Sequence, residues 1–454
     1  MEEIADIKSA EKRIFVLKEH EKFSQEDSEF IESLSIPFRV TPYEGSPVYL
    51  GIENNEASYY IGATWLTPDG NVDENTKAVV VVPRIDIDFI EMFISALNFT
   101  SSSEYFVKFY GIDFDAPQIK TDQARNHLTP LLIIHFLSVM KALVKHGLRK
   151  GYVWRERNLN KVKGRMMLTK HLQKNVFSKR EDRNFCRFQE YTEDIFENRL
   201  LKKTLLFVES AMNNTPAMKA HSMFSSLQLD INHLKSALSN VSSDVESDQV
   251  KQFHSSKLFR EYSEAIKLAR MILRRYDYSI QATSEEQHST PPFWIDMARL
   301  YEVYVYSKLA EVYGTENILF QVPGHGKTAV DFVKLDEHLI MDTKYKPRYQ
   351  SGDQKMIDDI REISGYARDI KILKRFEEEP DESIEEVKCI IIYPVIQPDI
   401  TDNGSYGEER EPEHDISFFP AGKLLPSCTK IKYFRNFYKI SVPLPYNKQD
   451  CTTP

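Results

Sequence analysis

The hydrophobic pattern at the start of the chain predicts a small α+β domain over residues 1–123. Two runs, 59–66 (YYIGATWL) and 78–85 (AVVVVPRI), are rich in aromatic and β-branched residues and have the composition of strands. Residues 89–97 (FIEMFISAL) instead place apolar side chains at helical spacing. Two strands followed by a helix indicate a compact module, and we expect this module to dock a partner.

Residues 124–290 have a different pattern, which predicts a mainly helical middle domain. Apolar residues recur every three or four positions in 131–148, 195–212 and 258–276. This period places them along one face of a helix, where they can pack against neighbouring helices.

The last part of the chain, residues 291–454, predicts helices and strands around one mixed sheet. In chain order we expect a helix at 294–313, strands at 318–322, 328–335 and 339–345, a long amphipathic helix at 356–376, and a strand at 387–393. The final strand (VKCIIIY) is apolar throughout, which is typical of a central strand covered on both faces. We therefore expect an α/β multidomain protein.

Charge is distributed unevenly along the chain. The formal net charge is −9, yet residues 149–180 contain eleven Lys or Arg and a single acid, Glu156. A basic strip on an acidic protein is typical of local binding to a phosphate backbone. The alternative is an ordinary solvated surface, which composition alone does not exclude.

Several classes of protein are disfavoured by features that the sequence lacks. It has no run of eighteen apolar residues and no basic, apolar leader at its N-terminus, so we expect no membrane segment and a cytoplasmic location. The four cysteines form no CxxC pair, which disfavours a zinc site. The segment 324–328 (GHGKT) resembles a phosphate-binding loop, but Gln321 stands where that motif needs glycine, so a hairpin turn is expected there.

The chemistry of the chain is expected around Asp331, Asp342 and Lys344. Asp331 lies inside one apolar strand, and Asp342 and Lys344 lie two residues apart on the next strand. Alternation along a strand puts Asp342 and Lys344 on one face, and an antiparallel hairpin would bring Asp331 alongside Asp342. Two facing carboxylates repel each other, and a hard cation such as Mg²⁺ relieves that repulsion. An Asp-x-Lys triplet alone is more typical of solvent-facing strand charges.

Glu302 strengthens the interpretation that these residues form a site. On the helix expected at 294–313 it shares a face with Ala298, Val305 and Leu309. A carboxylate on an apolar face needs a partner, because its burial alone is costly. The metal site is the partner that we expect.

These motifs resemble the PD-(D/E)xK nuclease superfamily, and more closely the McrC subunits of McrBC-type modification-dependent restriction systems. The resemblance rests on Met341-Asp342-Thr343-Lys344-Tyr345-Lys346, on Tyr366-Ala367 in the following helix and on the closing Tyr393-Pro394. Weaker matches lie earlier in the chain, at Ile61-Gly62, Pro83-Arg84-Ile85, Gly164-Arg165, and Asp194 with Asn198-Arg199. The resemblance as a whole implies a C-terminal domain with the fold of a restriction endonuclease.

The resemblance also implies roles for individual residues. Asp331 and Asp342 would bind Mg²⁺, with Mn²⁺ as a substitute, and the backbone carbonyl of Thr343 would be a further ligand. Lys344 would be the catalytic lysine, and Glu302 would complete or support the site. Two positions depart from the family pattern: Val330 replaces the usual proline, and Glu362 replaces the family's glutamine and adds negative charge near the site.

The function implied is cleavage of duplex, modified DNA by a nuclease subunit that forms a hetero-oligomer with an McrB-like AAA+ GTPase. Lys163, Arg165 and Lys346 are the candidates for DNA contact; for Arg165 a partner contact or a structural ion pair is an alternative. Two other functions stay open: a catalytically inactive adaptor that regulates the GTPase, and a stand-alone DNA-repair nuclease.

Overall fold

The fold is described by a computed structural model, in which the chain divides into two compact units, Met1–Leu128 with Gln287–Pro454, and Thr129–Glu286. The structure describes residues 14–25, 27–29, 52, 56–67, 72–73, 76–84, 87–99, 110–113, 116–120, 128–180, 182–214, 219, 224–245, 260–281, 289–326, 328–346, 356–376, 387–395 and 419–445. The second unit lies close to the predicted middle domain of 124–290. The segments before and after it, which the sequence assigned to separate domains, belong to one unit.

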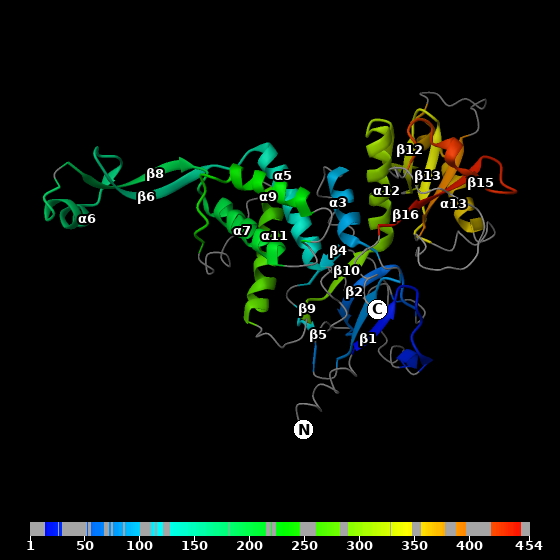
Figure 1. Ribbon diagram of the computed structural model, residues 1–454, viewed down its shortest axis with the longest axis horizontal. Coiled ribbons are helices and arrows are strands. Elements are labelled where there is room, and N and C mark those ends of the chain that lie inside the picture. Colours follow the sequence, from blue (N-terminus) through cyan, green and yellow to red (C-terminus); the bar gives the residue numbers. More distant parts are fainter. Residues whose placement is uncertain are drawn as a thin grey trace, which may run out of the picture. The chain divides into compact units, whose positions relative to one another are not determined.

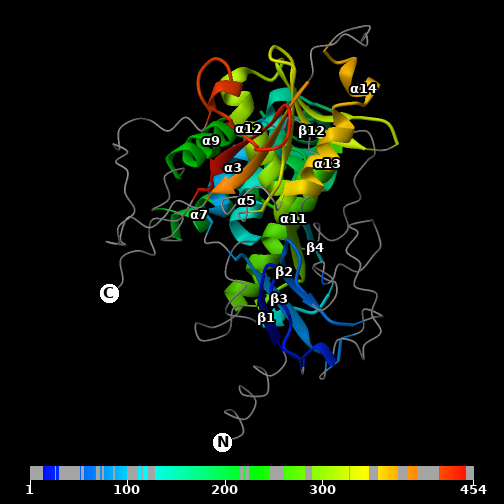
Figure 2. The ribbon, with the colours of Figure 1, turned by 90° about the vertical axis from the view of Figure 1, so that its right-hand side faces the viewer.

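A five-stranded sheet forms the first part of the larger unit (Figures 1 and 2). Its strands, in spatial order, are β1 (Ile14–Lys18), β3 (Ala78–Val82), β2 (Tyr60–Trp65), β10 (Phe293–Asp296) and β4 (Tyr110–Ile112). Strands β1 and β3 are parallel, and β2 is antiparallel to both β3 and β10. Helix α3 (Phe89–Phe99) follows β3, as the hydrophobic pattern predicted. A short ladder joins β5 (Ile119–Lys120) to β9 (Ser289–Thr290).

The start of the helix predicted at 294–313 was wrong. Residues Phe293–Asp296 form strand β10 between β2 and β4, and helix α12 spans Met297–Tyr313. Asp296 caps this helix, since its Oδ1 accepts a hydrogen bond from the Arg299 amide at 3.0 Å. The N-terminal sheet therefore leads without a loop into the helix that carries Glu302.

A six-stranded mixed sheet forms the C-terminal part of the same unit, in agreement with the predicted α/β layer. Its order is β11 (Ile318–Pro323), β12 (Ala329–Lys334), β13 (Leu339–Thr343), β14 (Lys388–Val395), β16 (Phe437–Pro443) and β15 (Thr429–Lys430), with the short helix η4 (Leu425–Ser427) before β15. The central strands β13 and β14 are parallel and almost wholly buried. Residues 324–326 and 328 lie between the antiparallel strands β11 and β12, where a turn was predicted for the GHGKT segment.

The long helix predicted at 356–376 is divided in two. Helix α13 spans Ile357–Tyr366 and α14 spans Ile370–Leu373. Asp369 separates them, because its side chain accepts from the Lys371 amide at 2.9 Å and caps the second helix. The apolar faces of both helices lie in the core of the sheet, so the hydrophobic period continues across the break.

The second unit combines helices with a long β-ribbon (Figure 1). The helices are α5 (Leu128–His146), α7 (Phe196–Asn214), α9 (Phe224–Ala237) and α11 (Arg260–Gln281). The prediction of a mainly helical domain missed the ribbon, in which β6 (Gly151–Leu159) and β7 (Arg165–Met166) flank β8 (Asn184–Thr192). The end of the ribbon carries α6 (Leu168–His171) and the helical turn η1 (Leu172–Val176).

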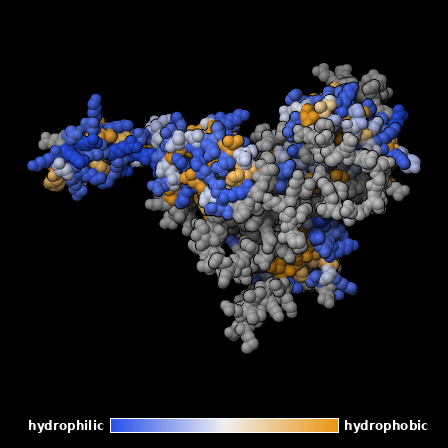
Figure 3. All heavy atoms as spheres, viewed as in Figure 1, coloured by the Kyte–Doolittle hydropathy of each residue, from blue (hydrophilic) through white to orange (hydrophobic). Residues whose placement is uncertain are grey.

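The basic strip, residues 149–180, forms much of the ribbon, which has little buried surface. Side chains alternate along β6 without a buried face, and most of the ribbon surface in Figure 3 is hydrophilic. Large side chains are nevertheless exposed on it: Tyr152, Trp154 and Tyr191 are 71%, 56% and 61% exposed. The sequence of β6 has no helical period, because the segment is a strand that pairs with β8 and does not pack as a helix. Among the described helices, none is both long enough and apolar enough to cross a membrane.

Candidate active site in the C-terminal sheet

The candidate site is built on the antiparallel hairpin of β12 and β13. The last ladder pair joins Phe332 to Met341, so the next position places Asp331 opposite Asp342. The hairpin on which the sequence interpretation depended is therefore present. Beyond β13, the Lys344 amide bonds the Ile392 carbonyl at 2.9 Å and prolongs the parallel pairing with β14.

Asp342 and Lys344 meet on one face of the sheet, as alternation along the strand predicted. Lys344 Nζ lies 2.7 Å from Asp342 Oδ2, and the two side chains are 14% and 5% exposed. An ion pair with so little access to water is screened less than a surface pair. The lysine points towards the acids, so the geometric premise of the site holds.

Asp331 is held by the neighbouring strand. Its Oδ2 accepts hydrogen bonds from the Thr343 amide at 2.7 Å and from the Thr343 hydroxyl at 2.6 Å. Thr343, which the sequence interpretation used only for its carbonyl, thus fixes the orientation of one acid. Its carbonyl as a metal ligand stays a prediction.

Glu302 reaches the same site from helix α12, and its partner was not foreseen. The side-chain amide of Gln321 donates a hydrogen bond to Glu302 Oε1. Gln321 lies in β11 at the position opposite Asp331 and has a positive φ of 50°, which is uncommon for a residue with a side chain. Its only signal in the sequence is a polar residue in the middle of an apolar strand.

The three carboxyl groups raise one another's pKa. Burial, opposed by Gln321, raises the pKa of Glu302 to about 7. Burial and repulsion from Glu302 raise the pKa of Asp331 to about 7, and burial and repulsion from Asp331 raise that of Asp342 to about 8. Burial lowers the pKa of Lys344, but attraction to Asp342 outweighs this effect and the net shift is upward. The Lys344 ammonium therefore lies beside Asp342, in a site whose three acids resist ionisation.

This donor set fits a hard divalent cation. Carboxylate oxygens are the ligands that Mg²⁺ prefers, and the ion commonly uses one or two of them and keeps several water molecules. Within the described residues, no group of three His, Cys, Asp or Glu side chains is arranged to hold a metal ion. Asp331 and Asp342 stand opposite each other on the hairpin and are the candidate side-chain ligands; the remaining ligands would be backbone oxygen and water.

The comparison with protein families matches residues 105–362, more than half of the chain, to the McrBC 5-methylcytosine restriction system component family. The chain belongs to this family. The resemblance to McrC subunits of McrBC systems is thereby confirmed, and the matched segment includes every residue of the candidate site.

Two solved structures of McrBC assemblies are similar to the chain. One is a half-complex from a tetradecameric assembly of Thermococcus gammatolerans McrB AAA+ hexamers with bound McrC; the match has 13% identity, covers 95% of each chain and has a TM-score of 0.36. The other is the Thermococcus gammatolerans McrBC complex, with 13% identity, 65% of this chain and 87% of that chain covered, and a TM-score of 0.29. No curated protein matches the chain.

Glu362, which the sequence resemblance set against a family glutamine, changes the environment of the lysine. It lies on α13, and its Oε2 lies 3.0 Å from Lys344 Nζ. The Tyr366 hydroxyl donates to Glu362 Oε1 at 3.4 Å. Lys344 is therefore held between a buried acid and the half-exposed carboxylate of Glu362.

Two glycines of the McrBC signatures are required by close approaches of the backbone. Gly62 has a φ of +144°, and a Cβ there would lie 2.1 Å from the Phe293 carbonyl oxygen of β10. Gly164 has a φ of +68°, and a Cβ there would lie 2.6 Å from the Arg187 carbonyl oxygen of β8. A side chain at either position would separate paired strands.

Asp194, with Asn198 and Arg199, forms one of the weaker family matches and lies where the ribbon joins helix α7. Asp194 pairs with Arg155 of β6 and accepts from Arg199 of α7 at 2.7 and 2.8 Å and from the Ser242 amide at 2.9 Å. Although burial opposes ionisation, these donors hold its pKa well below the ordinary value. Asn198 binds the Arg149 carbonyl and the Tyr262 hydroxyl. These signature residues connect the ribbon to the helices.

The predicted DNA contacts are divided between the two units. Lys163 and Arg165 are exposed on the ribbon, and Lys163 Nζ lies 4.3 Å from the centre of the Phe188 ring. Lys346 belongs to the other unit, where its Nζ lies 2.9 Å from Asp359 Oδ1, and Asp359 is 6% exposed. Lys346 thus has a structural partner, and DNA contact at all three residues stays a prediction.

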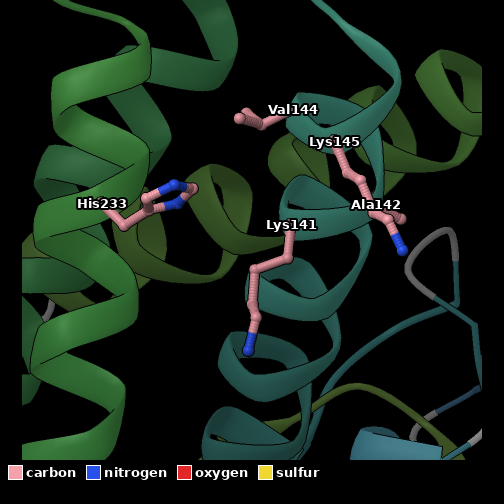
Figure 4. Close-up of a pocket in the computed structure, with 5 residues that line it drawn as sticks. All are labelled: Lys141, Ala142, Val144, Lys145 and His233. Atoms are coloured by element: carbon pink, nitrogen blue, oxygen red, sulfur yellow. The ribbon is translucent and has the colours of Figure 1, made fainter.

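A pocket in the second unit lies apart from these motifs. It is lined by Lys141, Ala142, Val144, Lys145 and His233, from helices α5 and α9 (Figure 4). Lys141 pairs with Asp230 at 2.9 Å. None of its lining residues belongs to a signature of the sequence, and we assign it no role.

Proposed function

We propose that this McrBC family member is the McrC-type nuclease subunit of a GTP-dependent restriction system and hydrolyses phosphodiester bonds of duplex, modified DNA. The observation that carries the proposal is the convergence of Asp331, Asp342 and Lys344 on one buried hairpin. This constellation, with Glu302 behind it, is the arrangement that a PD-(D/E)xK nuclease needs.

Asp331, Asp342 and the Thr343 carbonyl would hold Mg²⁺. When bound, the ion supplies a lowered pKa for its water and stabilises negative charge on the phosphate. The surrounding residues orient the acidic side chains before the ion binds. Thr343 fixes Asp331, Gln321 fixes Glu302, and mutual repulsion of the acids favours occupation by a cation.

Lys344 acts as a cation in this mechanism. Because its pKa is raised, the ammonium remains protonated at neutral pH and does not accept a proton from water. It can therefore neutralise charge that develops on the phosphate and orient the attacking water through its N–H groups. Asp342 aims it, through their contact of 2.7 Å.

A partner supplies energy and target choice in this proposal. The partner would be an McrB-like AAA+ GTPase that forms a hetero-oligomer with this chain, in which Gly324 and Thr328 lie between paired strands. One similar structure contains McrB AAA+ hexamers with bound McrC. Lys163 and Arg165 on the ribbon are the proposed contacts to DNA phosphates, and the exposed aromatic residues beside them suit a contact with DNA bases or with the partner.

The test is the Asp342→Ala variant in complex with an McrB-like GTPase partner. We expect loss of cleavage of methylated plasmid with GTP and Mg²⁺, while partner binding and GTPase stimulation remain at the wild-type level. Asp358→Ala, an exposed carboxylate on α13, is the matched control and should cleave normally. Unchanged cleavage by the Asp342→Ala complex refutes the site.

The two alternative functions predict different results in two further measurements. An adaptor without catalysis would show no Mg²⁺ or Mn²⁺ binding that depends on Asp331 and Asp342, which calorimetric titration of the isolated protein measures. A stand-alone repair nuclease would cleave DNA without the GTPase and without GTP. The proposed restriction subunit binds the metal and needs the partner.

A further inference from the structure

We propose that a basic surface around helix α14 binds the phosphate backbone of the DNA duplex beside the candidate site. This α14 surface consists of one residue between β11 and β12 and four residues in and around α14: His325, Arg368, Lys371, Lys374 and Arg375. The inference rests on the proposed nuclease function and deepens it, because it names where the substrate is held. None of the five residues is among the DNA contacts expected from the sequence.

The unit that contains the candidate site needs such a surface. Of the expected DNA contacts, Lys163 and Arg165 lie in the other unit, and Lys346 is paired with Asp359 at 2.9 Å. Lys344 is held between two carboxylates inside the site. Contacts between cations and phosphates supply much of the affinity of proteins for DNA and set its register. A duplex that enters the site must therefore be held by further cations of this unit.

Helix α14 packs on the face of the sheet that carries the site. Its Ile372 belongs to one buried cluster with Val333 of β12 and Ile340 of β13. Val333 lies two residues after Asp331, and Ile340 lies two residues before Asp342. Because side chains alternate along a strand, these two apolar residues share the face of the two acids. The α14 surface is therefore on the same side of the sheet as the acids.

The α14 surface also lies near the end of the sheet where the acids are. Asp331 is the third residue of β12, and His325 lies in the segment that directly precedes this strand. Gln321, opposite Asp331, comes four residues before His325, so their backbones are at most about 14 Å apart. One strand of a duplex carries a phosphate about every 3.4 Å along the helix axis. Phosphates next to the one in the site therefore come within reach of His325.

His325 is exposed, yet its ring is held in one orientation. Its side chain is 74% exposed, whereas that of its partner Asp369 is 11% exposed. Asp369 Oδ1 lies 2.8 Å from His325 Nδ1, and Asp369 Oδ2 accepts from the His325 amide at 2.6 Å. Burial works against ionisation of Asp369, but hydrogen bonds from His325 and the Lys371 amide outweigh it and lower its pKa to about 2. The carboxylate only accepts, so Nδ1 carries the proton and Nε2 is left for a ligand.

The exposed side of α14 and its flanks is basic. Lys371, Lys374 and Arg375 follow one another at three- and four-residue spacing, which puts them on one side of the helical segment, and all three are exposed. Lys371 Nζ donates to the Gly324 carbonyl at 3.2 Å, which ties α14 to the residue before His325. An ammonium has two more N–H groups, which can bind a phosphate oxygen. Arg368, in the link between α13 and α14, is exposed as well.

The position of the α14 surface selects DNA over another acidic ligand. It shares a face and an end of the sheet with the acids that would bind the metal ion, so the backbone that carries the phosphate to be cleaved passes beside it. The acid within the surface, Asp369, is occupied by His325 and by the amide of Lys371. The three glutamates that follow at 377–379 lie outside the described residues.

The experiment measures binding of the full-length chain to a short fluorescent DNA duplex in Ca²⁺ over a series of salt concentrations. Lys371→Ala with Lys374→Ala removes two cations of the surface, and arginine at both positions keeps them. Lys423→Ala with Lys430→Ala is the matched control: both lysines are exposed, and Lys430 lies in β15, at the sheet edge opposite to β11. Thermal unfolding of each variant checks the fold. Single-turnover cleavage is measured in the complex with the GTPase at rising DNA concentration.

We expect the double alanine variant at Lys371 and Lys374 to lose two phosphate contacts. The slope of log affinity against log salt should become smaller by about 2, at about 0.9 per contact, and affinity at about 0.1 M salt should fall by about 10- to 100-fold. Cleavage should be slower at low DNA concentration and recover at saturation, because contacts beside the reacting bond hold substrate and transition state equally. His325→Ala should weaken binding by about 3- to 10-fold, as expected for one contact. The double arginine variant and the control should keep the wild-type slope.

Other outcomes separate this proposal from the proposed function. If the wild-type complex cleaves no DNA but the double alanine variant shows the smaller slope, the proposed function fails and the phosphate-binding surface stands. If the wild-type complex cleaves and the variant keeps the affinity and slope of the control, or if control and variant lose affinity equally, the α14 surface is not the DNA contact. Loss of GTPase binding with unchanged DNA affinity would also overturn it, because the surface would then contact a protein.

Discussion

Replacing Asp342 by asparagine should stabilise the metal-free protein at alkaline pH. Asp342 is 4% exposed, and burial and repulsion from Asp331 raise its pKa from 3.8 to about 8. A carboxyl whose pKa is raised by folding favours the folded state while it is protonated. That stability is lost as the pH rises from the ordinary pKa towards 8. Asparagine does not ionise, so the variant escapes this loss.

The size of the effect follows from the shift. The difference of about 4 pKa units corresponds to on the order of 5 kcal/mol at most. The actual gain will be smaller, because Asp331 shares the repulsion and because Lys344 loses an anionic partner in the variant. We expect the variant to gain about 2 kcal/mol relative to wild type between pH 5 and pH 8.5.

The assay is urea unfolding in EDTA at both pH values, repeated with Mg²⁺. A cation at a hundredfold excess over its Kd stabilises the folded state by about 2.7 kcal/mol, which wild type should gain and the variant should not. Asp336→Asn, at the turn of the same hairpin, is the control, because Lys334 holds the Asp336 pKa below its ordinary value against the effect of burial. The reasoning fails if the Asp342→Asn variant shows no gain at pH 8.5, or if Mg²⁺ stabilises both proteins equally.

Three further predictions concern the neighbours of this acid and the ribbon. Glu362→Gln should tighten DNA binding in Ca²⁺ several-fold, measured by fluorescence anisotropy, because it removes a half-exposed negative charge beside Lys344; Asp358→Asn on the same helix should change little. Lys344→Gln should lower single-turnover cleavage by about 100- to 1000-fold while GTPase stimulation persists, and a smaller loss would contradict its role as a charge stabiliser. Asp194→Asn should destabilise the second unit by about 3 kcal/mol at pH 7 and by less near pH 2 in thermal unfolding, since the pKa of this acid is lowered and its contribution disappears on protonation.

The sequence by itself determined the local part of the site. Alternation with a period of two put Asp342 and Lys344 on one face, and two apolar strands joined by a short turn paired Asp331 with Asp342. Strands β2, β3 and β11–β14 and most helices follow from the same short-range rules, because each depends on residues that are neighbours in the chain. The same alternation predicted that the Tyr345 side chain lies on the face opposite to Asp342 and Lys344.

Only the tertiary structure decided which distant residues complete these elements. Gln321 holds Glu302 through an irregular backbone position, and β10 leaves the predicted helix to join the N-terminal sheet. The ribbon also escaped prediction, because strands without a buried face give no hydrophobic period. Periodicity reports which face of an element is buried, but a partner far along the chain is selected by packing and by the need to satisfy buried polar groups.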